Sequence, residues 1–458
     1  MAILTNNEAF GAAKRISARN DVDFDFKREG DDWGKFNEDW SFSVHEIPLE
    51  FRTSKKHENF ILAKQEEKEQ KLILKSKPYH IEIEPTNICN LHCPLCSTGV
   101  GAITRPKQKL KLENFKKLID EIKDTALLVA LQNWGEPTLV KDLPKMIRYA
   151  TDAGIWTHMA TNFSIKYSDE WLQELIKSGI GRLKIDLDGT TQEVYEKYRV
   201  GGNLETLLKN TRRAVEIKKE NKLKYPIIQA RMLATKKNEH QINDFQKLSK
   251  ELGVDEIEVG NIQLNPNTAA DEWLPENKDY VYDTYMGETR NTPCHWPWSG
   301  LVINSDGGVT SCTIVDDPGS DFGNVFETSI MDVWNNEYYV SSRTTWTENA
   351  KRSKTTICNI CKKIVKILGL DFNINLQFKI SANNIPKLIE INPRIGGTII
   401  LPTVAGVNLP YLAIKKALNE KFSAKKSIKK ITMIRYWKEL FANGEKSFEI
   451  NSNYKKTF

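Results

Sequence analysis

Residues 80–263 alternate between short apolar runs and longer amphipathic segments, and this alternation constrains the fold more than any other feature of the sequence. Segments with helical periodicity separate the short runs, and Gly154 and Gly179 stand where two of these helices should end. The six runs that read as strands cover 80–86, 126–132, 155–162, 181–189, 226–233 and 254–263. Regular β/α alternation predicts an α/β fold with a parallel sheet, either doubly wound or barrel-like.

The sequence divides into four regions. Residues 1–76 are polar and irregular, apart from a charged helical stretch around 57–75 that ends before Pro78. We predict that 1–76 is an N-terminal extension, either a partner-docking arm or, by preference, a poorly ordered segment. The other predicted regions are a β/α core, a cysteine-bearing region of short strands and turns, and an α+β C-terminal piece, at 77–285, 286–366 and 367–458.

Composition and charge suggest an ordinary globular protein. The 458 residues carry a net charge of +6, with 40% hydrophobic and 28% charged residues. The lysines are scattered, so we expect a solvated surface and no nucleic-acid partner. No apolar run reaches the ~18 residues of a membrane span, and we find no secretory signal, so we expect a cytoplasmic protein without a membrane partner. In that reducing compartment the seven cysteines should be metal ligands or reactive thiols.

Three cysteines follow the first strand in the stretch CNLHCPLC, at Cys89, Cys93 and Cys96. Three thiolates at this C-x3-C-x2-C spacing can bind three irons of a 4Fe-4S cluster and leave the fourth iron without a protein ligand. An open coordination position is what a catalytic metal needs. The alternative is a zinc site completed by His92 or by a distant residue, although no second pair of ligands stands nearby.

This spacing and its surroundings resemble the radical S-adenosylmethionine (SAM) superfamily over residues 79–262. The motif WGEP at 134–137 follows the second strand and resembles the family's GGE-type motif. The resemblance implies that Gly135 lets the backbone approach the ligand and that the Glu136 region receives the methionine amino group of SAM. Two positions around these motifs depart from the family pattern. Leu95 stands where the family often has an aromatic residue, and Trp134 replaces the first glycine of the GGE-type motif.

The ends of the third and fourth strands carry further marks of the family. Thr161 and Asn162 resemble its TN element, while Asp186 and Asp188 stand where it usually has a serine and an aspartate near the ribose and methionine groups. The resemblance also implies that Arg199, in the block YEKYRVGG, positions the SAM carboxylate. Because the carboxyl ends of the strands form the active-site face of a β/α barrel, we predict a partial (β/α)6 barrel that binds SAM at this face.

The remaining cysteines are Cys294, Cys312, Cys358 and Cys361. Four thiolates suit either zinc or an iron–sulfur cluster, and spacing alone does not decide between them. The sequence from PCHWPWSGLVINSDGGVTSC to CNIC resembles the SPASM/twitch auxiliary-cluster region of radical SAM enzymes, with a hairpin turn at Asp306-Gly307 and a helix at 330–334. The three further cysteines of a full SPASM region are absent after Cys361. The resemblance therefore implies one fully ligated auxiliary 4Fe-4S cluster for electron transfer.

Residues 367–440 resemble the last part of an ATP-grasp domain, through LIEINPRIGGTIILPTVAGVNLP. The resemblance implies that Glu390 and Asn392 hold Mg²⁺ and that Arg394 faces the phosphates. The earlier part of such a domain, with its nucleotide-gripping lysine, has no match. We interpret the piece as a vestigial or fused remnant that does not bind Mg-ATP alone; the alternatives are a half-site completed by a partner and a gene-boundary artefact. Its apolar strand is expected to pack on a helix at 411–418.

The resemblance implies a radical SAM enzyme of oxidoreductase or maturase type. A reduced cluster would cleave SAM to a 5′-deoxyadenosyl radical, which takes a hydrogen atom from a peptide, sugar or small-metabolite substrate. An electron donor such as flavodoxin or ferredoxin is the expected partner. The alternative is a non-catalytic iron–sulfur or zinc scaffold, which the departures at Trp134 and Asp186 would favour.

Overall fold

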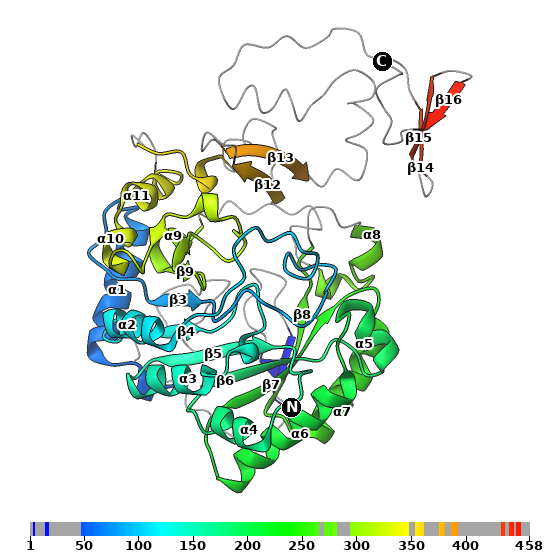
Figure 1. Cartoon of the computed structure of the whole chain (residues 1–458), viewed down its shortest axis with the longest axis horizontal. Helices are drawn as coiled ribbons and strands as arrows, with labels where there is room; N and C mark the ends of the chain where they lie inside the picture. Colours follow the sequence, from blue (N-terminus) through cyan, green and yellow to red (C-terminus); the bar gives the residue numbers. More distant parts are fainter. Residues whose placement is uncertain are drawn as a thin grey trace. The chain divides into compact units, whose positions relative to one another are not determined.

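The computed structural model describes residues 47–264, 270–281, 294–347 and 353–360, and several strands outside these ranges. Its internal contacts divide the chain into two compact units (Figure 1). The first unit comprises 1–286 and 291–359, and the second comprises 287–290 and 360–458.

Six parallel strands form the centre of the first unit. Each neighbouring pair in the sheet is also a neighbouring pair in the sequence, from β3 to β8 without a reversal. A doubly wound sheet reverses its strand order at a switch point, whereas a barrel keeps one direction throughout. The strand order therefore confirms the α/β fold and the partial (β/α)6 barrel. The strands are β3 (His80–Ile83), β4 (Leu128–Ala130), β5 (Trp156–Thr161), β6 (Arg182–Asp186), β7 (Ile227–Ala234) and β8 (Glu256–Asn261).

The helices that connect these strands cover the outer face of the sheet (Figure 1). The strand side chains on this face, such as Ile81 and Met159, are fully buried in one core with helix residues such as Phe115. Gly154 and Gly179 follow two of the helices with φ of +75° and +89°, as the sequence predicted for helix ends. The helices are α2 (Leu112–Ile122), α3 (Leu143–Asp152), α4 (Asp169–Ile176), α5 (Gln192–Tyr198), α6 (Leu204–Glu220) and α7 (Ile242–Leu252).

The inner face of the strands is polar. On β6, Arg182, Lys184 and Asp186 alternate with the buried Leu183 and Ile185. Because successive side chains of a strand point to opposite faces, the three charged residues all point away from the helices. The barrel therefore carries ionisable groups on the face that does not pack against its helices.

Further strands extend the sheet at both edges. At one edge β2 (Lys14–Ser17) pairs antiparallel with β8, and β1 (Ile3–Leu4) pairs with β2. At the other edge β9 (Gly300–Ile303) pairs parallel with β3. From β9 the sheet continues through the antiparallel strands β10 (Gly308–Thr310) and β11 (Gly323–Asn324). The cysteine-bearing region is thus built directly onto the first strand of the barrel.

The cysteine-bearing region also contains short α-helices on its described residues. These are α9 (Trp296–Ser299), α10 (Ile330–Trp334) and α11 (Glu337–Arg343). A reciprocal capping box of Ser329 and Asp332 starts α10, so the helix predicted at 330–334 is confirmed. The predicted turn at Asp306-Gly307 joins β9 to β10, with Gly307 at φ +83°, and is also confirmed.

Residues 47–76 pack against the barrel, so the expectation of a poorly ordered extension is wrong for this part of 1–76. The short helix η3 (Leu49–Phe51) and α1 (Ser54–Lys68) place their apolar side chains in a cluster next to the amino ends of the strands. That cluster includes Ile47, Phe51, Phe60, Ala63, Tyr79, Leu128, Trp156 and Ile227. The sequence concealed it because charged residues dominate α1, and only a few scattered apolar positions make the contact.

The described residues of the second unit form two small antiparallel sheets. In one, β12 (Asn375–Ile380) pairs with β13 (Pro386–Asn392), which confirms the predicted strand pair. Glu390 and Asn392 lie two residues apart on β13. The other sheet consists of β14 (Thr432–Arg435), β15 (Glu439–Asn443) and β16 (Lys446–Glu449).

Three predicted features lie outside the described residues: Cys361, Arg394 and the helix at 411–418. Within the part of the chain that the structure describes, no helix is both long enough and apolar enough to cross a membrane.

Candidate active site

Cys89, Cys93 and Cys96 lie in one tight loop directly after β3. The backbone N–H of Cys96 donates to the Cys93 carbonyl (3.2 Å), and that of Leu91 donates to Cys89 Sγ (3.4 Å). Burial, and to a smaller degree the two neighbouring thiols, raises the pKa of Cys89 to about 12. Thiolates gathered this closely need a positive partner, and an iron–sulfur cluster supplies one.

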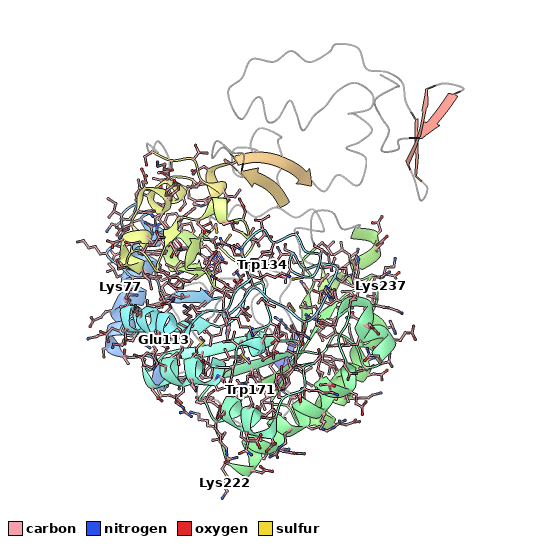
Figure 2. All side chains as sticks on the ribbon, viewed as in Figure 1. Lys77, Glu113, Trp134, Trp171, Lys222 and Lys237 are labelled. Carbon is pink, nitrogen blue, oxygen red and sulfur yellow. The ribbon has the colours of Figure 1, made fainter. Side chains whose placement is uncertain are left out.

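A glycine lets the neighbouring loop approach the start of the cysteine loop. A Cβ atom on Gly135 would lie 1.9 Å from the Thr86 carbonyl oxygen, which no side chain could tolerate. The next residue, Glu136, donates its backbone N–H to the Ile88 carbonyl at 2.9 Å. The 134–137 loop therefore lies directly against the chain that leads into Cys89, and Figure 2 shows Trp134 between the barrel and the region of α9–α11.

Glu136 is a buried carboxylate surrounded by hydrogen-bond donors. Its Oε1 accepts from the hydroxyls of Thr138 and Thr161, each at 2.6 Å, and its Oε2 accepts from the backbone N–H of Asn162 at 2.9 Å. The Asn162 side chain in turn donates to Asn90 in the cysteine loop (3.0 Å). Burial raises the pKa of Glu136, and these hydrogen bonds oppose the increase. The structure thus brings Glu136, Thr161 and Asn162 together, as the sequence predicted.

A second group of charges lies beside the cysteine loop. The Arg199 guanidinium bonds the carboxylates of Asp186 (2.9 Å) and Asp188, and Arg231 bonds the other oxygen of Asp186 (2.6 Å). The Arg199 Nη1 atom lies 4.0 Å from Cys93 Sγ. Desolvation opposes the charge on Arg199, but the two aspartates outweigh it and raise the pKa of Arg199 well above its usual value.

These contacts bear directly on the role expected for Arg199. Its guanidinium is already shared between two buried carboxylates, so a SAM carboxylate would have to compete with them. Its position instead places a permanent cation beside the thiol of Cys93. Arg231, which sequence reasoning missed, holds Asp186 in place from β7.

The second group of cysteines is assembled from separate segments. Cys312 follows β10, and the thiol of Cys358 approaches the Ser311 hydroxyl at 3.7 Å. Burial raises the pKa of Cys312 to about 12, and the neighbouring Cys358 adds to the increase. Cys294 stands just before α9 and is half-buried. The structure therefore places two of the four predicted ligands side by side, while Cys361 lies outside the described residues.

Among the described residues, no three histidine, cysteine, aspartate or glutamate side chains converge as the ligands of one ion would. Zinc ligands converge at about 2.0–2.3 Å from one centre, whereas the cysteines of a 4Fe-4S cluster bind separate irons around a cube.

Family comparisons agree with this chemistry. Residues 83–248 match the family model of the radical SAM superfamily, and residues 294–362 match that of an iron-sulfur cluster-binding domain. Over 83–248 the chain is therefore similar to the radical SAM superfamily. Residues 340–440 also match a model described as ATP-grasp in the biosynthetic pathway with Ter operon.

Curated relatives resemble part of this chain. The PqqA peptide cyclase of Bradyrhizobium diazoefficiens is 29% identical over 188 residues, which is 41% of this chain and 47% of that protein. The AdoMet-dependent heme synthase of Methanosarcina barkeri is 28% identical over 182 residues, 40% of this chain and 50% of that protein. The chain thus spans about half the length of these relatives.

A solved structure shares the fold. The crystal structure of Streptococcus suis SuiB bound to S-adenosylmethionine aligns with a TM-score of 0.50 at 18% identity. The alignment covers 68% of this chain and 78% of SuiB.

The radical SAM and cluster-binding matches together mean that SAM and 4Fe-4S clusters, one of them auxiliary, are the cofactors of this protein. The cysteine thiols described above suit iron as ligands, and the polar side chains beside them suit SAM.

Sequence reasoning missed Glu84 and Arg105, which lie close to both cysteine regions. Glu84 had a signal, because it continues the alternation of His80 and Glu82 on the inner face of β3, but Arg105 is a single arginine in a loop.

Proposed function

We propose that this chain is an enzyme that cleaves SAM reductively and uses the resulting 5′-deoxyadenosyl radical to take a hydrogen atom from its substrate. The placement of three thiols beside a buried glutamate and a half-buried arginine, at the carboxyl ends of the strands of one barrel, carries the proposal. When bound, the reduced 4Fe-4S cluster supplies one electron that breaks the bond between sulfur and C5′ of SAM, which leaves methionine and the radical.

The residues of the chain bind and orient the reactants. We assign Cys89, Cys93 and Cys96 to three irons of the cluster, and the carboxylate of Glu136 to the ammonium group of SAM. The hydroxyl of Thr161 and the backbone N–H of Asn162 fix that carboxylate before the ligand arrives, so little reorganisation is needed. Gly135 leaves room for the backbone of this loop next to the ligand.

The charge network of β6 has a second role in the proposal. Asp186 and Asp188 hold the Arg199 guanidinium, and Asp188 is itself fixed by the backbone N–H of Leu233 at 2.7 Å. A cation near Cys93 stabilises the negative charge that the cluster thiolates carry. Arg199 would therefore favour the reduced cluster.

In this proposal Cys294, Cys312, Cys358 and Cys361 ligate the auxiliary cluster, which exchanges an electron with the substrate. A peptide is the substrate class that we favour, because the curated relative with 29% identity is named as a peptide cyclase. Flavodoxin or ferredoxin is the proposed electron donor, and the reducing cytoplasm is the proposed location because it keeps the thiols reduced.

Anaerobic reconstitution tests the proposal. Dithionite-reduced protein with SAM should release 5′-deoxyadenosine, measured by mass spectrometry, and should bind roughly eight irons per chain. No 5′-deoxyadenosine from a protein with a full first cluster would refute the enzyme assignment and favour the scaffold.

We further propose that the C-terminal piece does not hydrolyse ATP. Its family match begins at residue 340 and covers a single stretch of the chain, without the earlier nucleotide-gripping part of an ATP-grasp domain. Mg²⁺ needs substrate phosphates to complete its coordination, and phosphoryl transfer depends on positioning that one half-site does not give. Calorimetric titration with Mg-ATP, with Glu390→Ala as the control, tests this, and micromolar binding that is lost in the variant would overturn it.

A further inference from the structure

One arginine of the barrel holds the cysteine-bearing region from two sides. Arg105 lies between Cys96 and α2, and its side chain is 1% exposed. Its Nη1 atom lies 2.9 Å from Asp306 Oδ2 and 3.0 Å from Asp321 Oδ2, and its Nη2 atom bonds the other oxygen of Asp321. Asp306 belongs to the β9–β10 turn and Asp321 to the segment before β11. The guanidinium therefore links the loop after Cys96 to the β9–β10 turn and to the segment before β11.

The surroundings are built for this ion pair. A Cβ atom on Gly308 would lie 2.1 Å from Asp321 Oδ2 and 2.7 Å from Arg105 Nη1, so only glycine leaves space for the two charges. Burial raises the pKa of Asp321 to about 6, and the hydrogen bond from Arg105 acts against that increase. Two largely buried carboxylates face one guanidinium, so both carboxylates depend on Arg105 for compensation.

A second buried charge ties the same turn to the proposed SAM loop. Glu84, at the end of β3, accepts from the Ser305 hydroxyl (2.8 Å) and from the backbone N–H of Trp134 (3.3 Å). Glu84 is 0% exposed, so these donors replace water around its charge. The residue before the Asp306-Gly307 turn and the first residue of the 134–137 loop therefore share one carboxylate.

A third contact joins the two cysteine loops themselves. The hydroxyl of Ser97, next to Cys96, lies beside the carboxylate of Asp316, which follows Cys312 by four residues, and opposes the rise that burial causes in the pKa of Asp316. With the contacts of Arg105 and Glu84, it links the first cysteine loop to the second through buried or half-buried polar groups.

We propose that Arg105 is a positioning residue that, together with Glu84, holds the cluster-binding region against the loop after Cys96 and so fixes the separation of the two cluster sites. The inference rests on the proposed function, because the separation matters only if both sites hold clusters. Its chemical consequence is that a substrate held between the clusters can react with one and exchange an electron with the other in a single geometry.

The test compares Arg105→Gln with Arg105→Lys in the reconstituted full-length protein. Electron paramagnetic resonance of the dithionite-reduced protein reports the magnetic interaction between the two clusters. Iron analysis should show that Arg105→Gln keeps both clusters. The interaction between the clusters should become weaker, and its electron paramagnetic resonance signal should become broader. Formation of 5′-deoxyadenosine should fall roughly tenfold. Arg105→Lys keeps the charge and should restore part of the interaction.

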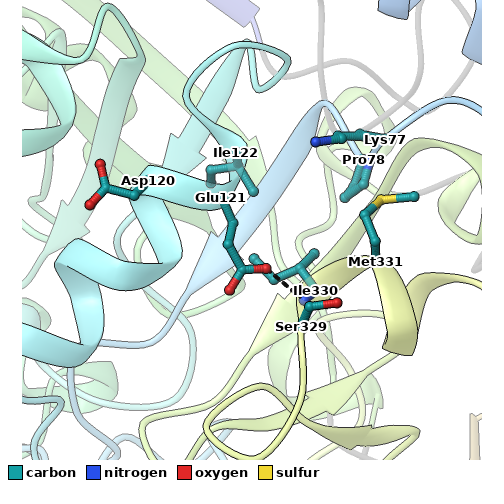
Figure 3. Close-up of a pocket in the computed structure, with 8 residues that line it drawn as sticks. All are labelled: Lys77, Pro78, Asp120, Glu121, Ile122, Ser329, Ile330 and Met331. Carbon is teal, nitrogen blue, oxygen red and sulfur yellow. Dashed lines mark hydrogen bonds between the residues drawn. The ribbon is translucent and has the colours of Figure 1, made fainter.

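A matched control breaks a different contact between the same two regions. The carboxylate of Glu121, near the end of α2, accepts from the backbone N–H of Ile330 at 2.8 Å, in a cavity of about 310 Å³ (Figure 3). Because α2 runs back toward the amino ends of the strands, this contact lies far from the cysteine loops. Glu121→Ala should leave the cluster interaction unchanged.

Each outcome of this test either supports or overturns the positioning role of Arg105, or it refutes the proposed function. If Arg105→Gln does not fold, Asp306→Asn removes one side of the same contact and should broaden the interaction in the same way. An unchanged interaction in an intact, two-cluster variant overturns the positioning role. A wild-type protein that holds no second cluster or releases no 5′-deoxyadenosine would instead refute the proposed function, so the two failures are distinguishable.

Discussion

The two cysteine regions reach related chemistry in different ways. Cys89, Cys93 and Cys96 lie within eight residues of sequence, in one loop after one strand. Cys312 and Cys358 are far apart in sequence and become neighbours only because the chain around Ser311 packs against the helical residues around Cys358. The first site is local, whereas the second depends on the tertiary structure of a whole region.

This difference has an energetic consequence. Bringing distant segments together costs chain entropy that grows with the length of the enclosed loop, and a bound cluster repays part of that cost. The local loop already lies at the end of β3 and encloses few residues. We therefore expect the first cluster to dominate activity and the second cluster to contribute more to stability.

The largest expected effect is on activity. Replacement of Cys89, Cys93 and Cys96 together by alanine should abolish 5′-deoxyadenosine formation, because no thiolate remains to hold the irons that face SAM. The auxiliary cluster should keep its spectroscopic signal, since its predicted ligands Cys294, Cys312, Cys358 and Cys361 are unchanged in this variant. Mass spectrometry and electron paramagnetic resonance on one reconstituted sample measure both. Residual 5′-deoxyadenosine from this triple variant would show that the catalytic iron lies elsewhere.

The next effect is on iron and stability. Replacement of Cys312 and Cys358 by serine should lower the iron content from roughly eight to roughly four per chain. It should also lower the melting temperature more than the triple alanine variant does, because a distributed site loses more tertiary structure. Metal analysis and calorimetry measure these two quantities. One zinc and four irons in the wild-type protein would contradict the auxiliary cluster, and equal melting temperatures of the two variants would contradict the energetic comparison.

A smaller effect is expected at the carboxylate beside the first loop. Glu136→Gln keeps the shape of the side chain but removes the charge that we assign to the ammonium group of SAM. A hydrogen bond to a charged group contributes about 1.5–3 kcal/mol, so the KM for SAM should rise roughly 10- to 100-fold. Steady-state kinetics measure the change, and Glu121→Gln, distant from the cysteine loops, is the control. An unchanged KM would assign the ammonium group to another acceptor.

The same contrast explains what the sequence predicted. The barrel and its active-site end were predictable because each strand and helix shows its own local pattern, and because Glu136, Thr161 and Asn162 all follow strands. The first cysteine loop was predictable from spacing alone. Local patterns in the sequence therefore located the barrel and the loops at the carboxyl ends of its strands.

The remaining features depend on contacts between distant residues. Arg105 meets Asp306 and Asp321 across about two hundred positions of sequence, and no periodicity marks such a partner. The packing of 47–76 and the pairing of β9 with β3 are of the same kind. The sequence singled out Arg199, but it did not show that two aspartates already bind its guanidinium.

The smallest expected effect concerns β3, the strand that both regions share, since it pairs with β4 on one side and β9 on the other. Glu82 lies on its inner face and is 6% exposed, and the Gln132 amide donates to its carboxylate at the long distance of 3.5 Å. Burial raises the pKa of Glu82 from 4.5 to about 7. The folded protein therefore binds this proton more tightly than the unfolded chain does. The contribution of Glu82 to stability is fully present below pH 4.5 and is lost as the pH rises to 7.

Glu82→Gln removes this titration and keeps the side-chain volume. We expect it to raise the free energy of unfolding by about 1–3 kcal/mol at pH 8 and to leave it nearly unchanged at pH 4.5. Denaturant unfolding of the cluster-free protein at both pH values measures the difference, with Glu113→Gln on the exposed face of α2 as the control. Because β3 supports both regions, the gain at pH 8 should be the same whether Cys89 or Cys312 has been replaced. A gain that depends on either cysteine would show that β3 is coupled to one region more than to the other, and equal changes at the two pH values would contradict the raised pKa.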